Sequence, residues 1–112
     1  MATIRLDDTT VGRRDLEKGT RDAWADALAD PKVRAWLKKN GVADPASLVD
    51  AGIEVSEADD GVSDGVGTVL ITIASGVAVN LIGQLFAAFI LPRLKERFGA
   101  GAVGNVVSTD KQ

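Results

Sequence analysis

The residues best suited to chemistry in this 112-residue chain are acids gathered in one glycine-rich stretch. Four of them lie within eight positions of one another: Glu57, Asp59, Asp60 and Asp64. Hard cations such as Ca²⁺ bind several carboxylate oxygens at once, but the spacing of these acids is not that of an EF-hand loop. We therefore expect a solvated acidic loop, with a weak divalent-cation site as the alternative, and we predict no metal centre.

The overlapping segment 61–67 contains three glycines and would connect a strand to a helix, which is where phosphate-binding loops lie. It lacks both the lysine of a P-loop and the spacing of a dinucleotide-binding fingerprint, and the neighbouring acids would repel a phosphate. The chain also has no cysteine and no histidine, so thiolate metal sites and the commonest general base are excluded. We expect no cofactor and no enzymatic activity.

The strongest physical signal is the stretch 66–92, in which 27 consecutive residues carry no charged side chain. A helix of that length would measure about 40 Å, which exceeds the roughly 30 Å of a bilayer's hydrocarbon core. We predict one long helix over residues 66–98 that ends in basic turns. Its cations Arg93, Lys95 and Arg97 would lie near lipid phosphates at a membrane interface.

A helical wheel drawn over this stretch separates two faces. Small and weakly polar residues form the face that we expect to mediate helix association: Thr72, Gly76, Asn80, Gly83, Gln84 and Ala87. Apolar residues form the face that we expect to contact lipid or a protein core: Leu70, Val77, Leu81, Leu85 and Phe89. Small residues allow close backbone approach, and amides form hydrogen bonds across an interface, so self-association is predicted.

The elements before this stretch predict a small α+β domain over residues 1–56. Alternating apolar residues indicate two short strands, at 2–6 and at 53–56, which we expect to pair with each other. Between them, helical spacing and Asp-Pro start signals predict helices over 13–29 and 31–39 and a short turn near 45–50, with Trp24 and Trp36 in the core. The fold class is therefore α+β, with an acidic hinge at 57–65, the long helix, and a flexible tail at 99–112 in which residues 106–107 could form a short extended piece.

The apolar helix must be buried, and three environments remain open: a bilayer, the interior of an oligomer, or the core of a single chain. We predict a small membrane-associated protein that self-associates, either to permeabilise membranes or to anchor an assembly, and that is made in the cytoplasm without a signal peptide. The alternative is a cytoplasmic, homo-oligomeric scaffold or adaptor with the helix at its centre. Copies of the chain and membrane lipid are the expected partners, and the net charge of −3 argues against nucleic acid.

Overall fold

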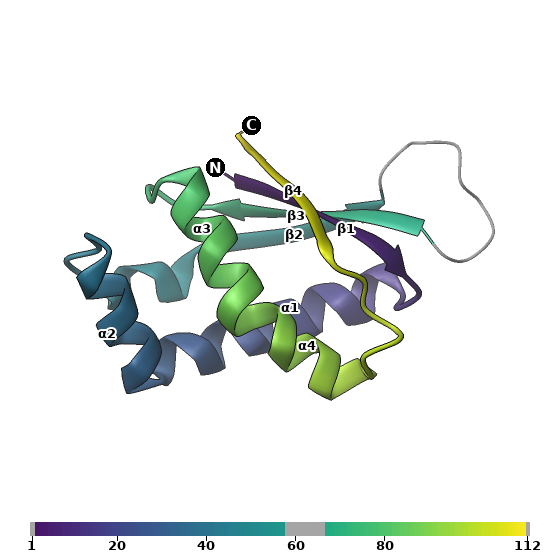
Figure 1. Cartoon of the computed structure of the whole chain (residues 1–112), viewed down its shortest axis with the longest axis horizontal. Helices are drawn as coiled ribbons and strands as arrows, with labels where there is room; N and C mark the ends of the chain where they lie inside the picture. Colours follow the sequence, from purple (N-terminus) through teal and green to yellow (C-terminus); the bar gives the residue numbers. More distant parts are fainter. Residues whose placement is uncertain (1, 58–66, 112) are drawn as a thin grey trace.

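A sheet with helices on one side is the basic architecture of the computed structural model, which describes residues 2–57 and 67–111 (Figure 1). Most of the predicted acidic hinge, including Asp59, Asp60 and Asp64, lies outside the described residues. The prediction of a hinge therefore stays a prediction. The α+β fold class is confirmed, because helices and an antiparallel sheet share one hydrophobic core.

The secondary-structure elements follow one another as β1 (Ala2–Thr9), α1 (Arg13–Ala29), α2 (Pro31–Lys39), the 3₁₀ turn η1 (Pro45–Asp50), β2 (Gly52–Glu57), β3 (Gly67–Ala74), α3 (Val79–Leu85), the π-helical turn η2 (Phe86–Ile90), α4 (Leu91–Phe98) and β4 (Val106–Lys111). The predicted bounds of α1 and α2 are confirmed. Asp30 begins α2 as predicted, because its carboxylate accepts a hydrogen bond of 2.9 Å from the backbone N–H of Lys32.

The strands are ordered β2-β3-β1-β4 in the sheet, and each neighbouring pair is antiparallel. The expected pairing of the two N-terminal strands is wrong, because β3 lies between them: Ile71 of β3 pairs with Ile4 of β1 and with Val55 of β2. With helices after β1 and after β3, this is the β-α-β-β-α-β topology of ferredoxin-like domains. That topology serves many unrelated functions and predicts none by itself.

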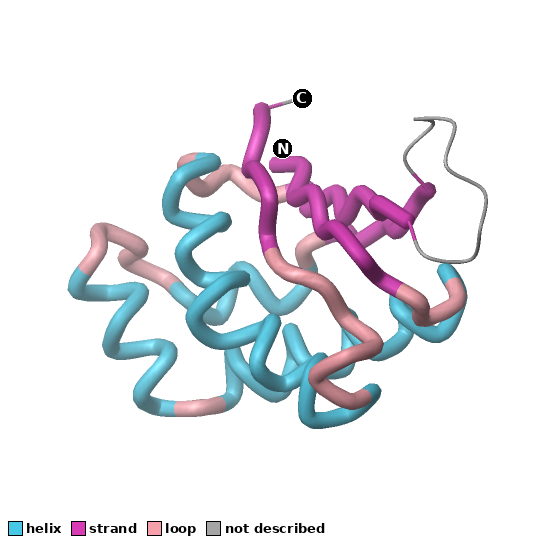
Figure 2. Tube along the Cα trace, turned by 45° about the vertical axis from the view of Figure 1, so that its right-hand side comes forward, coloured by secondary structure: helices cyan, strands magenta, loops and turns pink. Residues whose placement is uncertain are grey.

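Alternation along the strands places the core between the sheet and the helices. Ile4 and Leu6 of β1, like Ile71 and Ile73 of β3, are fully buried, whereas the alternate residues Leu70 and Thr72 of β3 are only half-buried. Figure 2 shows the strands gathered on one side of the molecule and the helices on the other. The opposite surface of the sheet is covered by no helix among the described elements.

Two tryptophans join the helices to this core in different ways. Trp24 is 1% exposed and its indole Nε1 donates a hydrogen bond of 2.7 Å to the Leu48 carbonyl, which ties α1 to η1. Trp36 is half-buried and packs edge to face on Phe89, with 5.4 Å between the ring centroids. The predicted core position is confirmed for Trp24, whereas Trp36 lies at the margin of the core.

The predicted helix over 66–98 is wrong in its first part, since residues 67–74 form the inner strand β3 and helix begins only at Val79. The β-branched residues of this segment, such as Ile71 and Ile73, pack well on a pleated surface, and a loop around Gly76 separates strand from helix. None of the helices in the described ranges combines the length and the apolar character that a bilayer crossing requires.

The helical run Val79 to Phe98 continues through Pro92 by means of a π-helical turn. Proline has no backbone N–H, so Pro92 cannot donate the hydrogen bond that an α-helix requires. In a regular α-helix its ring would also collide with the Ala88 carbonyl. Here the N–H of Leu91 bonds to the carbonyl of Phe86, five residues earlier, which widens the turn just before the proline. The widened turn also rotates the following residues relative to a uniform helical wheel.

The predicted flexible tail is wrong for residues 106–111, which form β4 and pair with β1. The chain reaches β4 through a close approach at Gly104, where an added Cβ would overlap the carbonyl oxygen of Asp7. Hydrogen bonds hold this approach: Gly104 N–H donates to Thr9 Oγ1 at 3.2 Å, and Asn105 N–H to Asp7 Oδ1 at 2.9 Å. Gly104 thus has a structural reason to be glycine.

Candidate functional site

The residues of the predicted association face do not lie together. Thr72 is on β3 and Gly76 is in the following loop, so neither belongs to a helix. The others lie on α3 and η2, where Asn80, Gln84 and Ala87 are exposed and Gly83 is half-buried. The helical wheel failed because it treated a strand, a loop and a widened helix as one regular helix.

The predicted apolar face is likewise divided. Leu70 is half-buried on the sheet surface that faces away from the helices, Val77 is in the loop, and Leu81 and Phe89 are half-buried on the helical run. Only Leu85 is fully buried. The residues that fill the core here have four-residue spacing, a signal that the sequence does contain: Ile82, Phe86, Ile90 and Leu94.

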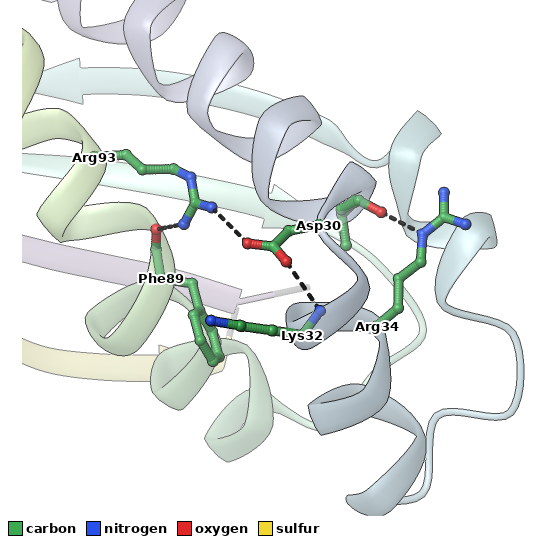
Figure 3. A network of polar contacts seen from close by, with 6 residues as sticks. Asp30, Lys32, Arg34, Phe89 and Arg93 are labelled. Atoms are coloured by element: carbon green, nitrogen blue, oxygen red, sulfur yellow. Dashed lines mark hydrogen bonds and ion pairs between the residues drawn. The ribbon is translucent and has the colours of Figure 1, made fainter.

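The three basic residues of α4 contact three different parts of the chain. Figure 3 shows Arg93 between the Phe89 carbonyl, at 2.7 Å, and the Asp30 carboxylate, at 3.3 Å. Arg97 forms an ion pair of 2.8 Å with Asp22 of α1, and Lys95 donates to the Asn105 side chain at 2.9 Å. These cations therefore link elements of the domain to one another: Arg93 and Arg97 both line the groove between α1 and α4, whereas Lys95 contacts Asn105.

Two grooves on the helical side are lined by mixed or weakly polar surfaces. The groove between α1 and α4, of about 480 Å³, contains the ion pair of Arg97 and further charges of both signs, including Asp26 and Glu96. The second, of about 380 Å³, lies between η1 and the loop around Gly76. Among the described residues no cluster of histidine, cysteine or acidic side chains is placed to hold a metal ion.

The uncovered surface of the sheet has a more specific composition, and we call it the open face. Register aligns its described side chains in two rows across the strands: Glu54, Thr72 and Thr3 in one, Ser56, Leu70 and Arg5 in the other. Glu54 on β2 and Arg5 on β1 lie on opposite sides of β3, and β4 continues the sheet beyond β1. Among the side chains that the structure describes, which on β4 include only that of Val106, neither Glu54 nor Arg5 takes part in an ion pair.

Thr3 near the middle of the open face is the described residue whose hydrogen bonding is least complete. It is only 5% exposed, and its Oγ1 is buried without a hydrogen-bond partner in the described structure. Most buried hydroxyls in folded proteins have a partner, so an orphaned one needs an explanation. The Thr3 hydroxyl is buried within the domain itself, so it is not a contact point for an outside group.

The β2 edge of the sheet, in contrast, is protected by side chains of α1. Arg21 Nη2 donates to the Ile53 carbonyl at 3.0 Å, and the Val55 N–H donates to Glu17 Oε2 at 3.1 Å. Glu17 and Arg21 also form an ion pair of 3.1 Å with each other. Addition of a strand to this edge would have to break these bonds, and such covered edges resist pairing with other chains.

Comparison with known proteins adds no information on this site: no family model, no curated protein and no solved structure gives a significant match to the chain.

Proposed function

We propose that this chain is a non-catalytic assembly module that associates with copies of itself through the open face of its sheet. The observation that carries the proposal is the one-sided covering of the sheet, with a polar, mixed-charge surface left over its strands. Ferredoxin-like topology supplies helices for one face alone, so the other face of the antiparallel sheet is left to solvent or to a partner.

The chemistry of the open face supports binding to protein. Leu70 is a half-buried apolar group between polar neighbours, and Arg5 and Glu54 supply opposite charges on either side of it. Interfaces of this kind, with a small apolar centre and a polar rim, are typical of reversible protein association.

The membrane role predicted from the sequence would need the helical run to leave this core. Ile82, Phe86, Ile90 and Leu94 are fully buried against the sheet and the other helices. Exposure of these side chains to lipid would remove them from the domain and open a large cavity there. The role of a homo-oligomeric scaffold, in contrast, requires no rearrangement of the folded chain.

Sedimentation velocity without detergent tests the proposal. We expect the mass to rise from the 11.7 kDa of one chain toward twice that value between about 1 µM and about 1 mM, a range suited to weak association. Vesicle flotation of the same sample provides the comparison. A chain that stays monomeric throughout and floats with anionic vesicles would contradict the proposal and favour the membrane role.

A further inference from the structure

We infer that the second copy stacks face to face on the open face, about a two-fold axis that runs along β3, and places Arg5 of each copy beside Glu54 of the other. This inference rests on the proposed self-association and adds its geometry. Its observation is the arrangement of the cation Arg5 and the anion Glu54 on opposite sides of β3 on one surface.

The register between the strands determines which residues of the two copies face each other about a two-fold axis along β3. β1 and β2 flank β3, so rotation about β3 places β1 of one copy over β2 of the other. Arg5 is in the row of Ser56, and Glu54 is two residues from Ser56 along β2. Arg5 therefore lies over Ser56 of the second copy, and Glu54 of that copy is the next residue along β2 on the same face.

Side-chain lengths suit this distance. Facing sheets pack about 10 Å apart with their strands roughly aligned, a gap that two long charged side chains can bridge. Leu70 lies on β3 and meets Leu70 of the second copy, while Thr72 meets its own counterpart. The symmetry makes both Arg5–Glu54 contacts together, so a single substitution alters the interface twice.

Charge complementarity favours a second copy over other arrangements. If the two-fold axis ran across the strands, β1 would lie over β1 and β2 over β2, so that Arg5 would approach Arg5 and Glu54 would approach Glu54. The stack about β3 instead opposes unlike charges, and it leaves intact the bonds of Glu17 and Arg21 that protect the β2 edge. Electrostatic matching of this kind contributes mainly to orientation and specificity.

The available area predicts a reversible dimer. In this stack β4 has no strand opposite it, so three strands spaced by about 4.8 Å, each about six residues long, overlap over roughly 300 Å² per copy. This is well below the roughly 800 Å² per partner of a standard protein interface, so weak association in the range of about 100 µM to 1 mM is expected. Removal of the charge contacts from so small an interface should have a clear effect on association.

Charge reversal tests this geometry by sedimentation equilibrium. Arg5→Glu and Glu54→Arg should each weaken dimerisation about tenfold or more, because like charges then face each other twice. The double variant Arg5→Glu/Glu54→Arg should recover most of the lost affinity. Lys38→Glu makes the same charge change on an exposed residue of α2 and should leave the dimer unchanged. Far-UV circular dichroism and thermal melts check that each variant is folded.

The outcomes separate the inference from the proposed function. If the wild type dimerises but the double variant stays as weak as the single ones, or neither single variant has an effect, the two-fold stack is wrong while self-association stands. Association through the β4 edge or through α3 would give that second pattern. If the wild type is monomeric at every concentration, the proposed function itself is refuted.

Discussion

Neighbouring residues of β3 should respond in opposite ways to the same truncation. Ile71 is 0% exposed and faces the helices, whereas Leu70 is half-buried and faces the open side. We expect Ile71→Ala to be strongly destabilising and Leu70→Ala to be mild in the monomer. A helix over the same residues would place both side chains on its apolar face and would predict similar losses.

The expected loss in the free energy of unfolding follows from how deeply each of the two side chains is buried. Truncation of a fully buried isoleucine to alanine costs about 3 kcal/mol, from lost transfer free energy and the remaining cavity. For a half-buried leucine the loss is about 1 kcal/mol, because part of the side chain is already in water. For a domain of this size a loss of about 3 kcal/mol lowers the melting temperature by about 12 °C.

Urea unfolding followed by tryptophan fluorescence measures both free energies, since Trp24 is buried in the same core. The samples should be kept at low micromolar concentration, where association at the open face does not contribute. Equal losses for the two variants, or a larger loss for Leu70→Ala, would refute the assignment of residues 67–74 to a strand with these faces.

Three further substitutions, one of them with a matched control, test other contacts of the fold by the same unfolding assay. Trp24→Phe should cost about 2–3 kcal/mol, because the buried Leu48 carbonyl loses its 2.7 Å donor and the smaller ring packs less well. Gly104→Ala should cost at least about 2 kcal/mol through overlap with the backbone of β1, whereas Gly101→Ala, with open space around it, should stay within about 0.5 kcal/mol. Arg97→Ala should cost less than about 1 kcal/mol, since its ion pair is exposed, and the loss should shrink further in high salt; a large, salt-independent loss would contradict this reading.

Local signals were sufficient to predict the first half of the fold. The helices at 13–29 and 31–39 have complete apolar stripes, and Asp30 and Pro31 mark their junction by short-range chemistry. β1 and β2 alternate apolar with charged residues, so their strand character is visible in the sequence. Each of these features depends on residues a few positions apart.

β3 was missed because its outer residues are not charged. Leu70 and Thr72 lie on the open face, yet both are compatible with a continuous apolar run, so the alternation that marks a strand is hidden. The run then continues without a charge into the helix that begins at Val79. The distinction between strand and helix depended on pairing with β1, about 65 residues earlier in the chain, which no local pattern shows.

The open face was beyond prediction for a related reason. Arg5, Glu54 and Leu70 come from three strands that only the sheet order brings together. For β4 the sequence indicated only a short extended piece at residues 106–107, since the full strand and its pairing depend on β1 and on the close approach at Gly104. The sequence showed that residues 66–92 carry no charged side chain, but it could not show which of them share a face.

Cysteine cross-linking tests the central claim most directly, because the chain has no cysteine of its own. Thr72→Cys lies on the proposed two-fold axis, and Asn80→Cys is exposed on α3, although the sequence had placed both residues on one association face. With a bismaleimide that spans about 10 Å, the spacing of facing sheets, we expect covalent dimers from Thr72→Cys and none above background from Asn80→Cys. Dimers from Asn80→Cys alone would show that the helix, and not the open face, mediates assembly.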